Sequence, residues 1–174
     1  MLRSRNFDND ERMGQIGENI LRSRLMRMRS EGRIQFFTDD TKKPASRRDD
    51  IDFHVVMEDG HELTYECKTD AYGLKTRNIT YEITSRDYAG CLGRSNADYI
   101  HYVFVDSGNN VVEEYAITLH KWRNWLGVMY KEVKPYKKGS GNPLQLFYSE
   151  DIGVLQFLCN IDRMVEDGVA KRLL

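Results

Sequence analysis

The 174-residue sequence has no apolar run long enough to span a membrane and no paired cysteine motif. A membrane-spanning helix needs about 20 predominantly apolar residues, and the Arg-rich start of the chain lacks the apolar segment of a secretory signal. The three cysteines are widely spaced and odd in number, which argues for a reducing compartment and against a structural zinc site. We therefore expect a soluble, cytoplasmic protein with one domain and a sizeable core.

Neither sign of charge dominates, because the net charge is only −1. The distribution is uneven: residues 1–48 carry twelve Lys/Arg against seven Asp/Glu, a net charge of +5, which leaves −6 on the rest of the chain. Such a basic segment is typical of a phosphate-binding face, and equally of the solvated face of a helix. Charge alone leaves both interpretations open.

Residues 50–68 carry the clearest local pattern, two runs that alternate apolar and polar residues around a turn at residues 58–60. Such alternation predicts a hairpin of two half-buried strands. With a three-residue loop, Met57 pairs with His61, paired residue numbers sum to 118, and Gly60 takes the left-handed position. A two-residue loop would set apolar faces against polar ones. The favoured register brings together the apolar residues Ile51, Phe53, Val55 and Met57 with Leu63, Tyr65 and Cys67.

The same register sets Asp52 directly across from Glu66, with Lys68 two residues along on the same face. Two carboxylates opposite each other repel and destabilise a plain hairpin. A cation between them removes the conflict, and Mg²⁺ typically takes one or two carboxylates together with water and substrate phosphate. Asp49 and Asp50 concentrate further negative charge in this stretch. The hairpin is therefore a candidate metal-dependent site.

Residues 9–31 show the apolar spacing of an amphipathic helix, with a glycine directly after them as its stop. Gly14 and Gly17 lie on the apolar arc, where they let the helix approach a sheet closely. Glu18 lies at the edge of that arc. It either looks along the sheet into a cleft or forms an ordinary i,i+4 pair with Arg22.

The remaining elements are predicted from local patterns. We expect strands over residues 33–38, 78–84, 98–105, 111–118 and 144–148, with the third of these central and antiparallel to the fourth. We expect a helix over residues 119–131 with Leu119, Trp122, Leu126 and Met129 on one stripe, and one or two helices over residues 150–167. Trp122 and Trp125 are more typical of a core or an interface than of base stacking. Residues 132–143 are rich in proline, glycine and lysine and predict a mobile basic loop.

A helical acid, a strand acid and an acid-x-lysine on the next strand together resemble the PD-(D/E)XK nuclease superfamily. This is the fold of many restriction endonucleases and Holliday junction resolvases. Glu18, Asp52, Glu66 and Lys68 match its four places, although Ile51 stands where the family often has proline. The stretches ITYEI and GCLGRSNADYIHYV also look like those of small phage and bacterial nucleases of this superfamily.

The resemblance implies an α+β (α/β) fold with a restriction-endonuclease-like mixed β-sheet flanked by helices. Its αβββαβ core would cover about residues 10–120 of a single nuclease-like domain spanning residues 1–174. Residues 121–174, which match nothing known to us, would form a C-terminal helical extension.

The resemblance also implies an Mg²⁺-dependent deoxyribonuclease. Asp52 and Glu66 would hold Mg²⁺ or Mn²⁺, with the backbone carbonyl of Cys67 as a further ligand. Lys68 would position the attacking water and the phosphate, and Glu18 would take a second metal or a water of the first. The Cys67 thiol would point into the core. DNA is the implied partner, a homodimer is a further expectation, and the implied location is the cytoplasm of a bacterium or a phage-infected host.

Two other classes of function remain open. One is a catalytically silent DNA-binding or inhibitory protein on the same fold. The other is a protein-interaction module built around the Trp-bearing helix. Tyr72 and Lys75 lie next to the site in sequence and would contact DNA in a nuclease, but no pattern singles them out. His54 shares the site face by parity and is either a phosphate contact or a surface histidine.

Overall fold

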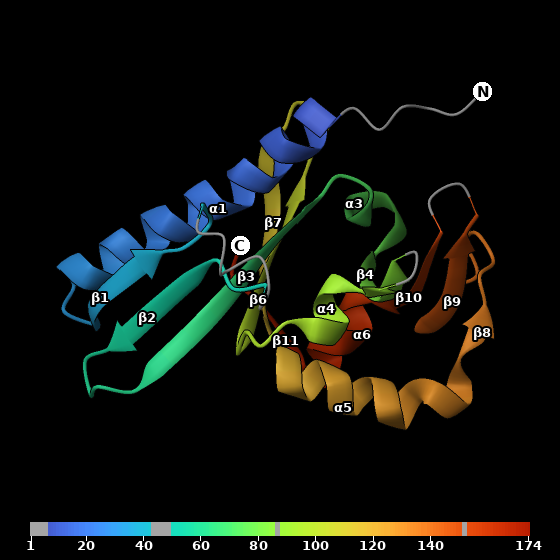
Figure 1. Cartoon of the computed structure of the whole chain (residues 1–174). Helices are drawn as coiled ribbons and strands as arrows, with labels where there is room; N and C mark the ends of the chain where they lie inside the picture. The colour runs from blue at the N-terminus through green and yellow to red at the C-terminus, as the bar shows by residue number, and fades with distance from the viewer. Residues whose placement is uncertain (1–6, 43–49, 86–87, 151–152) are drawn as a thin grey trace.

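The protein, described here by a computed structural model, consists of two β-sheets with helices packed against them (Figure 1). The structure describes residues 7–42, 50–85, 88–150 and 153–174. The fold is of the α+β class, with mixed sheets flanked by helices. The elements in chain order are α1 (Phe7–Ser30), β1 (Ile34–Asp39), β2 (Phe53–Met57), β3 (Glu62–Asp70), α3 (Gly73–Thr76), β4 (Asn78–Ser85), β5 (Tyr88–Ala89), α4 (Cys91–Arg94), β6 (Tyr99–Val105), β7 (Val111–Thr118), α5 (Leu119–Met129), the 3-10 helix η1 (Tyr130–Glu132), β8 (Lys134–Pro135), β9 (Leu144–Ser149), β10 (Val154–Asn160), α6 (Ile161–Glu166) and β11 (Ala170–Arg172).

The larger sheet has six strands in the order β1-β2-β3-β6-β7-β11. Strands β1, β2 and β3 form an antiparallel meander, β6 lies parallel to β3, and β7 and β11 are antiparallel to their neighbours. The predicted antiparallel pairing of residues 98–105 with 111–118 is confirmed as β6 with β7. Parallel neighbours require a long crossover, and here the crossover from β3 to β6 carries α3, β4, β5 and α4.

One face of this sheet is covered by α1, which packs along β1 and β3. Leu21 and Leu25 of the helix pack there against Phe53 and Val55 of β2, and all four are almost completely buried. The amphipathic spacing of residues 9–31 therefore correctly predicted a helix there and which side of it is buried. This smaller core lies on the same face of the sheet as Cys67, whose side chain packs against it.

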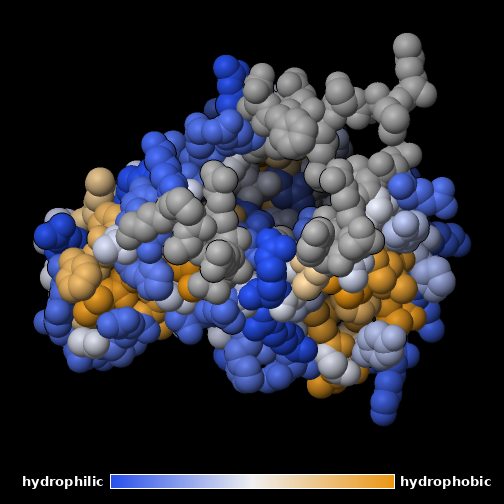
Figure 2. Space-filling model, in the orientation of Figure 1, coloured by the Kyte–Doolittle hydropathy of each residue, from blue (hydrophilic) through white to orange (hydrophobic). Residues whose placement is uncertain are grey.

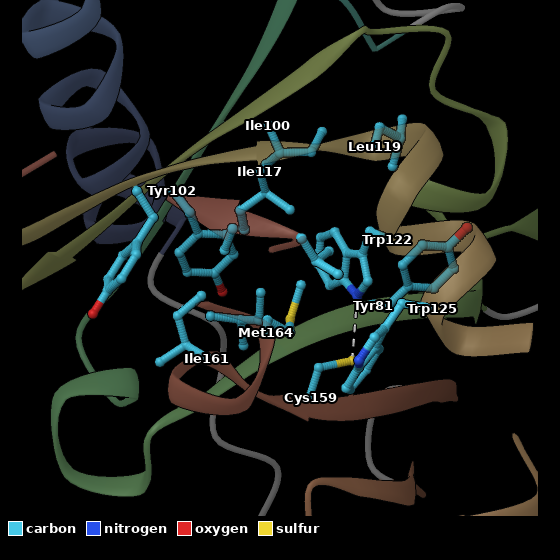
Figure 3. Close-up of a cluster of buried hydrophobic side chains, with 14 of the residues drawn as sticks. Tyr81, Ile100, Tyr102, Ile117, Leu119, Trp122, Trp125, Cys159, Ile161 and Met164 are labelled. Carbon is cyan, nitrogen blue, oxygen red and sulfur yellow. Dashed lines mark hydrogen bonds between the residues drawn. The ribbon is translucent and has the colours of Figure 1, made fainter. Parts of the chain in front are cut away.

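The second sheet, in the order β5-β4-β10-β9-β8, contributes with α5 and α6 to a larger core on the other side. Figure 3 shows this core around Trp122, whose indole Nε1 donates to Cys159 Sγ at 3.4 Å. Trp122 is fully buried and Trp125 nearly so, which puts both in the core, one of the two places that the sequence left open for them. Tyr81 of β4 meets the Trp122 ring edge-on at a centroid distance of 5.2 Å. The larger core therefore joins the crossover strand β4 to α5.

The predicted hairpin register is confirmed. Phe53 pairs with Tyr65 and Val55 with Leu63, so the residue numbers sum to 118. Met57 N donates to His61 O at 2.9 Å, and Gly60 has a φ of +88°. A positive φ is strained for a residue with a Cβ, which explains the glycine at the third loop position.

The prediction of helices over residues 150–167 is wrong for most of that range, and the C-terminal region is not a helical extension. Val154–Asn160 form β10, which lies between β4 and β9, and only Ile161–Glu166 are helical. The reason is tertiary: burial between two strands decides the conformation of this apolar run, and its periodicity alone does not. The Asn160 side chain accepts from Arg163 N and caps α6, which is the one local signal for this boundary.

The C-terminal segment also completes the larger sheet, because β11 pairs with β7. Residues 121–174 therefore contribute a strand to the sheet that contains the hairpin, as well as three strands to the second sheet.

The contact of α1 with β3 gives a test of the packing beside Glu18. A Cβ at Gly17 would lie 2.6 Å from Thr69 Oγ1, whereas a Cβ at Gly14 would meet nothing within 4 Å. Both Gly→Ala changes gain helix propensity of about 1 kcal/mol. We expect Gly17→Ala to unfold with a free energy about 1–3 kcal/mol lower than Gly14→Ala in urea titrations, because only the former overpacks the interface.

The double variant Gly17→Ala/Thr69→Ala provides the control. Thr69 Oγ1 is buried and has no hydrogen-bond partner among the described residues, so its removal frees space without breaking a bond. It should return most of the lost stability. Equal stability of Gly14→Ala and Gly17→Ala would contradict the close approach of helix and strand.

Candidate functional site

Asp52 lies at the point where the regular pairing of β2 with β3 ends. Its backbone N–H donates to Tyr65 O at 2.7 Å, and its Oδ2 accepts from Cys67 N at 2.8 Å. The carboxylate thus takes the place of a backbone carbonyl as the partner of Cys67. Because the last paired residues are Phe53 and Tyr65, the ladder stops one residue short of the predicted Asp52–Glu66 pair.

This break in the ladder corrects one prediction about the hairpin. Ile51 does not share the face of Phe53 and Val55 but is buried in the larger core. The chain before it is fixed by Asp50, which has a φ of +47° and forms an ion pair with Arg94 at 2.9 Å. Asp50 is therefore neutralised by a partner far along the chain. Asp49 lies outside the described residues.

Glu66 is only 6% exposed and lies on the opposite face of β3 from Cys67. Its Oε1 is 2.6 Å from Lys68 Nζ. Burial raises the pKa of Glu66 to about 7, the Lys68 ammonium opposes this rise, and the Asp52 carboxylate adds to it. The site thus contains a carboxyl group that titrates near neutrality because its charge is poorly solvated.

The Asp52 carboxyl belongs to the same electrostatic environment. Burial raises the pKa of Asp52, while the hydrogen bond from Cys67 N and the charge of Lys68 lower it. Two partly desolvated carboxyl groups therefore share the field of one lysine. One oxygen of each is committed, to Cys67 N and to Lys68 respectively.

Glu18 approaches this site from α1. Burial and the charge of Asp52 raise the pKa of the half-buried Glu18, and Arg22 lowers it. Arg22 itself forms its ion pair with Asp39, where its Nε donates to Oδ2 at 2.7 Å. Glu18 therefore lies near enough to Asp52 to feel its charge, which agrees with a side chain directed along the sheet. Arg22, the alternative partner of Glu18, pairs with Asp39 of β1.

The Cys67 thiol packs on the α1 side, as predicted, and burial raises its pKa well above the ordinary value. His54 is exposed, with Nε2 at 3.5 Å from Asp40 Oδ2. The hairpin therefore presents Glu66 and Lys68 to one face and Cys67 to the other, which the period-2 pattern predicted.

A buried polar cluster that the sequence did not reveal lies behind Cys67. His101, the β6 neighbour of Cys67, contacts Glu114 Oε1 through Nε2 at 2.7 Å. Arg24 of α1 donates to both Glu114 oxygens, at 3.0 and 2.6 Å. Although burial opposes it, the hydrogen bonds from His101 and Arg24 lower the pKa of Glu114 to about 2. No local pattern signals this contact, because Arg24 and Glu114 are 90 residues apart.

The arrangement combines two acids with one lysine at the edge of a strand pair, beside a helical acid. Within the described ranges, no group of three or more His, Cys, Asp or Glu side chains is arranged to hold a metal ion. Figure 2 shows hydrophilic side chains alternating with two hydrophobic areas in the orientation of Figure 1, with a hollow near the position of α3. A pair of acids with a lysine can bind a cation, a proton or a phosphate oxygen.

No model of a known protein family matches the chain, and no curated protein matches it in sequence. None of the helices in the described part of the chain is long and apolar enough to cross a membrane.

The raised pKa of Glu66 predicts a specific dependence of stability on pH in the presence of EDTA. The carboxyl titrates at about 7 in the folded protein and ordinarily at 4.5, so the folded state binds the proton more tightly. The resulting stabilisation is complete below the unfolded value and is lost as the pH rises through the folded one. We expect the wild type to lose about 3 kcal/mol over this window relative to Glu66→Gln, measured by urea titration. Parallel stability curves for the two proteins would contradict the buried environment of Glu66.

Proposed function

We propose that this protein is a metal-dependent endonuclease that hydrolyses DNA phosphodiester bonds. The observation that carries the proposal is the pair of acids on one hairpin, the half-buried Asp52 and the buried Glu66, with Lys68 bound to Glu66. The acids lie close enough for the Asp52 charge to raise the pKa of Glu66. Adjacent desolvated carboxylates are unfavourable unless a cation or a proton neutralises them.

The order of elements supports a restriction-endonuclease-like core. The chain passes from α1 through the meander of β1, β2 and β3, then by a crossover to the parallel strand β6. This order agrees with the αβββαβ pattern implied by the resemblance. The crossover is longer than a single helix, because β4 and β5 leave to form part of the second sheet.

The donor set suits a hard divalent cation. Mg²⁺ is commonly held by one or two carboxylates, with water and substrate phosphate completing its shell, so three protein acids are not required. Apart from Cys67 N and Lys68, no hydrogen-bond partner of the Asp52 or Glu66 carboxylate is found among the described residues. The residues that would hold Mg²⁺ or Mn²⁺ are therefore Asp52 and Glu66, with the backbone carbonyl of Cys67 as a further ligand, and Glu18 would take a second metal or a water of the first.

Phosphodiester hydrolysis requires an activated water and the neutralisation of charge on a phosphate that already repels the nucleophile. A bound divalent cation lowers the pKa of water and stabilises the developing charge. Neighbouring carboxylates favour the charged form of an ammonium group, so the role proposed for Lys68 is to position the water and the scissile phosphate, not to remove a proton. Glu66 holds Lys68 in place, and the Cys67 N–H holds Asp52.

DNA as the substrate, a homodimer that cuts two strands, and a place in the cytoplasm of a bacterium or phage-infected host belong to the same proposal. The basic excess of residues 1–48 supports a phosphate-bearing partner. Duplex, junction, flap and single strand are the substrate forms to compare.

One observation favours a second candidate, a catalytically silent DNA-binding protein on the same fold. Lys68 Nζ lies 2.6 Å from Glu66 Oε1, an oxygen that a metal ion would otherwise bind. The Asp52 charge raises the pKa of Glu18, but the described residues include no group of three acids arranged to hold a metal ion. A stable Lys68–Glu66 pair would replace the cation. This candidate binds DNA equally well in Mg²⁺ and in EDTA.

The nuclease proposal predicts cleavage of plasmid or branched DNA in Mg²⁺ or Mn²⁺, and none in EDTA. Asp52→Asn, Glu66→Gln and Lys68→Ala should each lower the cleavage rate by about a hundredfold or more, because each removes a charge that acts on the transition state. Gel assays of purified variants measure this.

Glu62→Gln is the matched control, because Glu62 is an exposed acid at the start of the same strand. It should cleave at the wild-type rate. If no DNA form is cut with either metal, or if Glu66→Gln and Lys68→Ala cut normally, the enzyme proposal is wrong. DNA binding without cleavage would support the silent protein instead.

A further inference from the structure

A second candidate site lies in a groove of about 860 Å³ between the second sheet, α3 and the chain that connects β8 to β9. Its volume is in the range of about 300–1,000 Å³ that is usual for ligand sites. Figure 1 shows β4, β10 and β9 side by side to the right of the larger sheet, with α3 near one end of β4. Strand β3 ends at this groove, because Asp70 is one of its lining residues.

The charge of the groove is positive. Lys75, Lys137 and Lys138 line it, and Asp70 is the one acid among the described lining residues. The Asp70 carboxylate is already engaged: it accepts from Tyr72 N at 2.6 Å and from Tyr102 Oη at 3.2 Å. Among the described residues, no ion pair engages Lys75, Lys137 or Lys138, so their ammonium groups can attract an anion.

The connection that carries two of these lysines is built into the fold. Gln145 is only 3% exposed, and its Oε1 accepts from Lys137 N and from Ser140 Oγ, each at 3.0 Å. Tyr136 N donates to Leu146 O at 2.9 Å. Residues 132–143, expected from the sequence to be a mobile loop, thus include the short strand β8, and a buried amide holds the lysines at the groove.

Aromatic and amide side chains line the same groove. Tyr72 is 79% exposed, and Tyr136 meets the Phe147 ring edge-on at a centroid distance of 5.0 Å. Asn78 and Asn160 provide amides that both donate and accept hydrogen bonds. An aromatic ring beside lysines is a usual platform for the stacking of a nucleic-acid base.

We propose that this groove binds a single strand of nucleic acid. Lysines attract the phosphates, and tyrosine rings stack on bases, whose faces are accessible only where the strand is unpaired. Lys68 and Asp70 lie on one face of β3 about 7 Å apart along the strand. A strand in the groove therefore leads toward Lys68. This relation to cleavage rests on the proposed function, while binding in the groove does not.

The test is fluorescence anisotropy of labelled oligothymidine and of a matched hairpin duplex, titrated in EDTA so that no cleavage occurs. We expect oligothymidine to bind more tightly than the duplex. Tyr72→Ala should weaken its binding about fivefold or more through loss of base stacking. Lys137→Ala/Lys138→Ala should reduce the slope of log K against log salt by about 1.4, since a single strand contributes about 0.7 per phosphate contact.

The controls are Tyr148→Ala and Lys171→Ala, which truncate exposed side chains outside the lining of the groove. They should leave binding unchanged, and circular dichroism should show all variants folded. The proposal is overturned if the groove variants bind as the controls do, or if duplex is preferred and Tyr72→Ala has no effect.

The outcomes for the groove and for the nuclease are separable. Failure to cut any DNA with normal groove binding would refute the nuclease alone. Cleavage that persists while the groove variants bind normally would refute the groove alone.

Discussion

The hydrogen bond from Cys67 N to the Asp52 carboxylate is the constraint on which the arrangement of the site depends. A side-chain oxygen replaces the backbone acceptor that a continued ladder would supply, so the regular pairing of β2 with β3 ends at Phe53 and Tyr65. The preceding residue, Ile51, is then free to enter the larger core. Because the bond ties an acid to the backbone beside Glu66, the two carboxyl groups stay close although their electrostatic interaction is unfavourable. The arrangement resembles a functional site, where an unfavourable local interaction is maintained by the surrounding fold.

The electrostatic cost at this point is concentrated on Glu66. Its neighbours offer one ammonium group against two carboxyl groups, and its burial removes the water that would otherwise solvate the charge. At neutral pH the group is therefore balanced between its protonated and ionised forms, and a small change in nearby charge shifts that balance. By contrast, Glu114 on the other face has two strong partners, His101 and Arg24, and keeps its charge down to about pH 2. Glu66, with one cationic partner, titrates near neutral pH, whereas Glu114, with two strong partners, stays ionised and serves to hold the fold together.

Much of the hairpin and of α1 could be predicted from the sequence, because both depend on local periodicity and on one glycine with positive φ. The same pattern correctly separated the faces of Glu66 and Cys67. The contacts that fix the site are long-range, such as Asp50 with Arg94 and Arg22 with Asp39, and no spacing rule signals them. The helical prediction for β10 failed for the same reason, since only its position between β4 and β9 makes it a strand. The lysines and tyrosines of the groove can be read from the sequence, but only the fold shows that they lie together, because they come from distant segments of the chain.

The interleaving of the two sheets has a consequence for synthesis of the chain. Strand β4 ends at Ser85, yet the strand that covers its long edge, β10, begins only at Val154. Until then Ile79 and Tyr81, which are buried in the finished protein, have no complete core to enter. The meander, α1 and the β6–β7 pair can form meanwhile from nearer segments. While residues 86–153 are synthesised, the edge of β4 that β10 covers in the finished protein has no partner there, a state prone to association with other chains. Completion of the second sheet therefore has to follow the synthesis of β10.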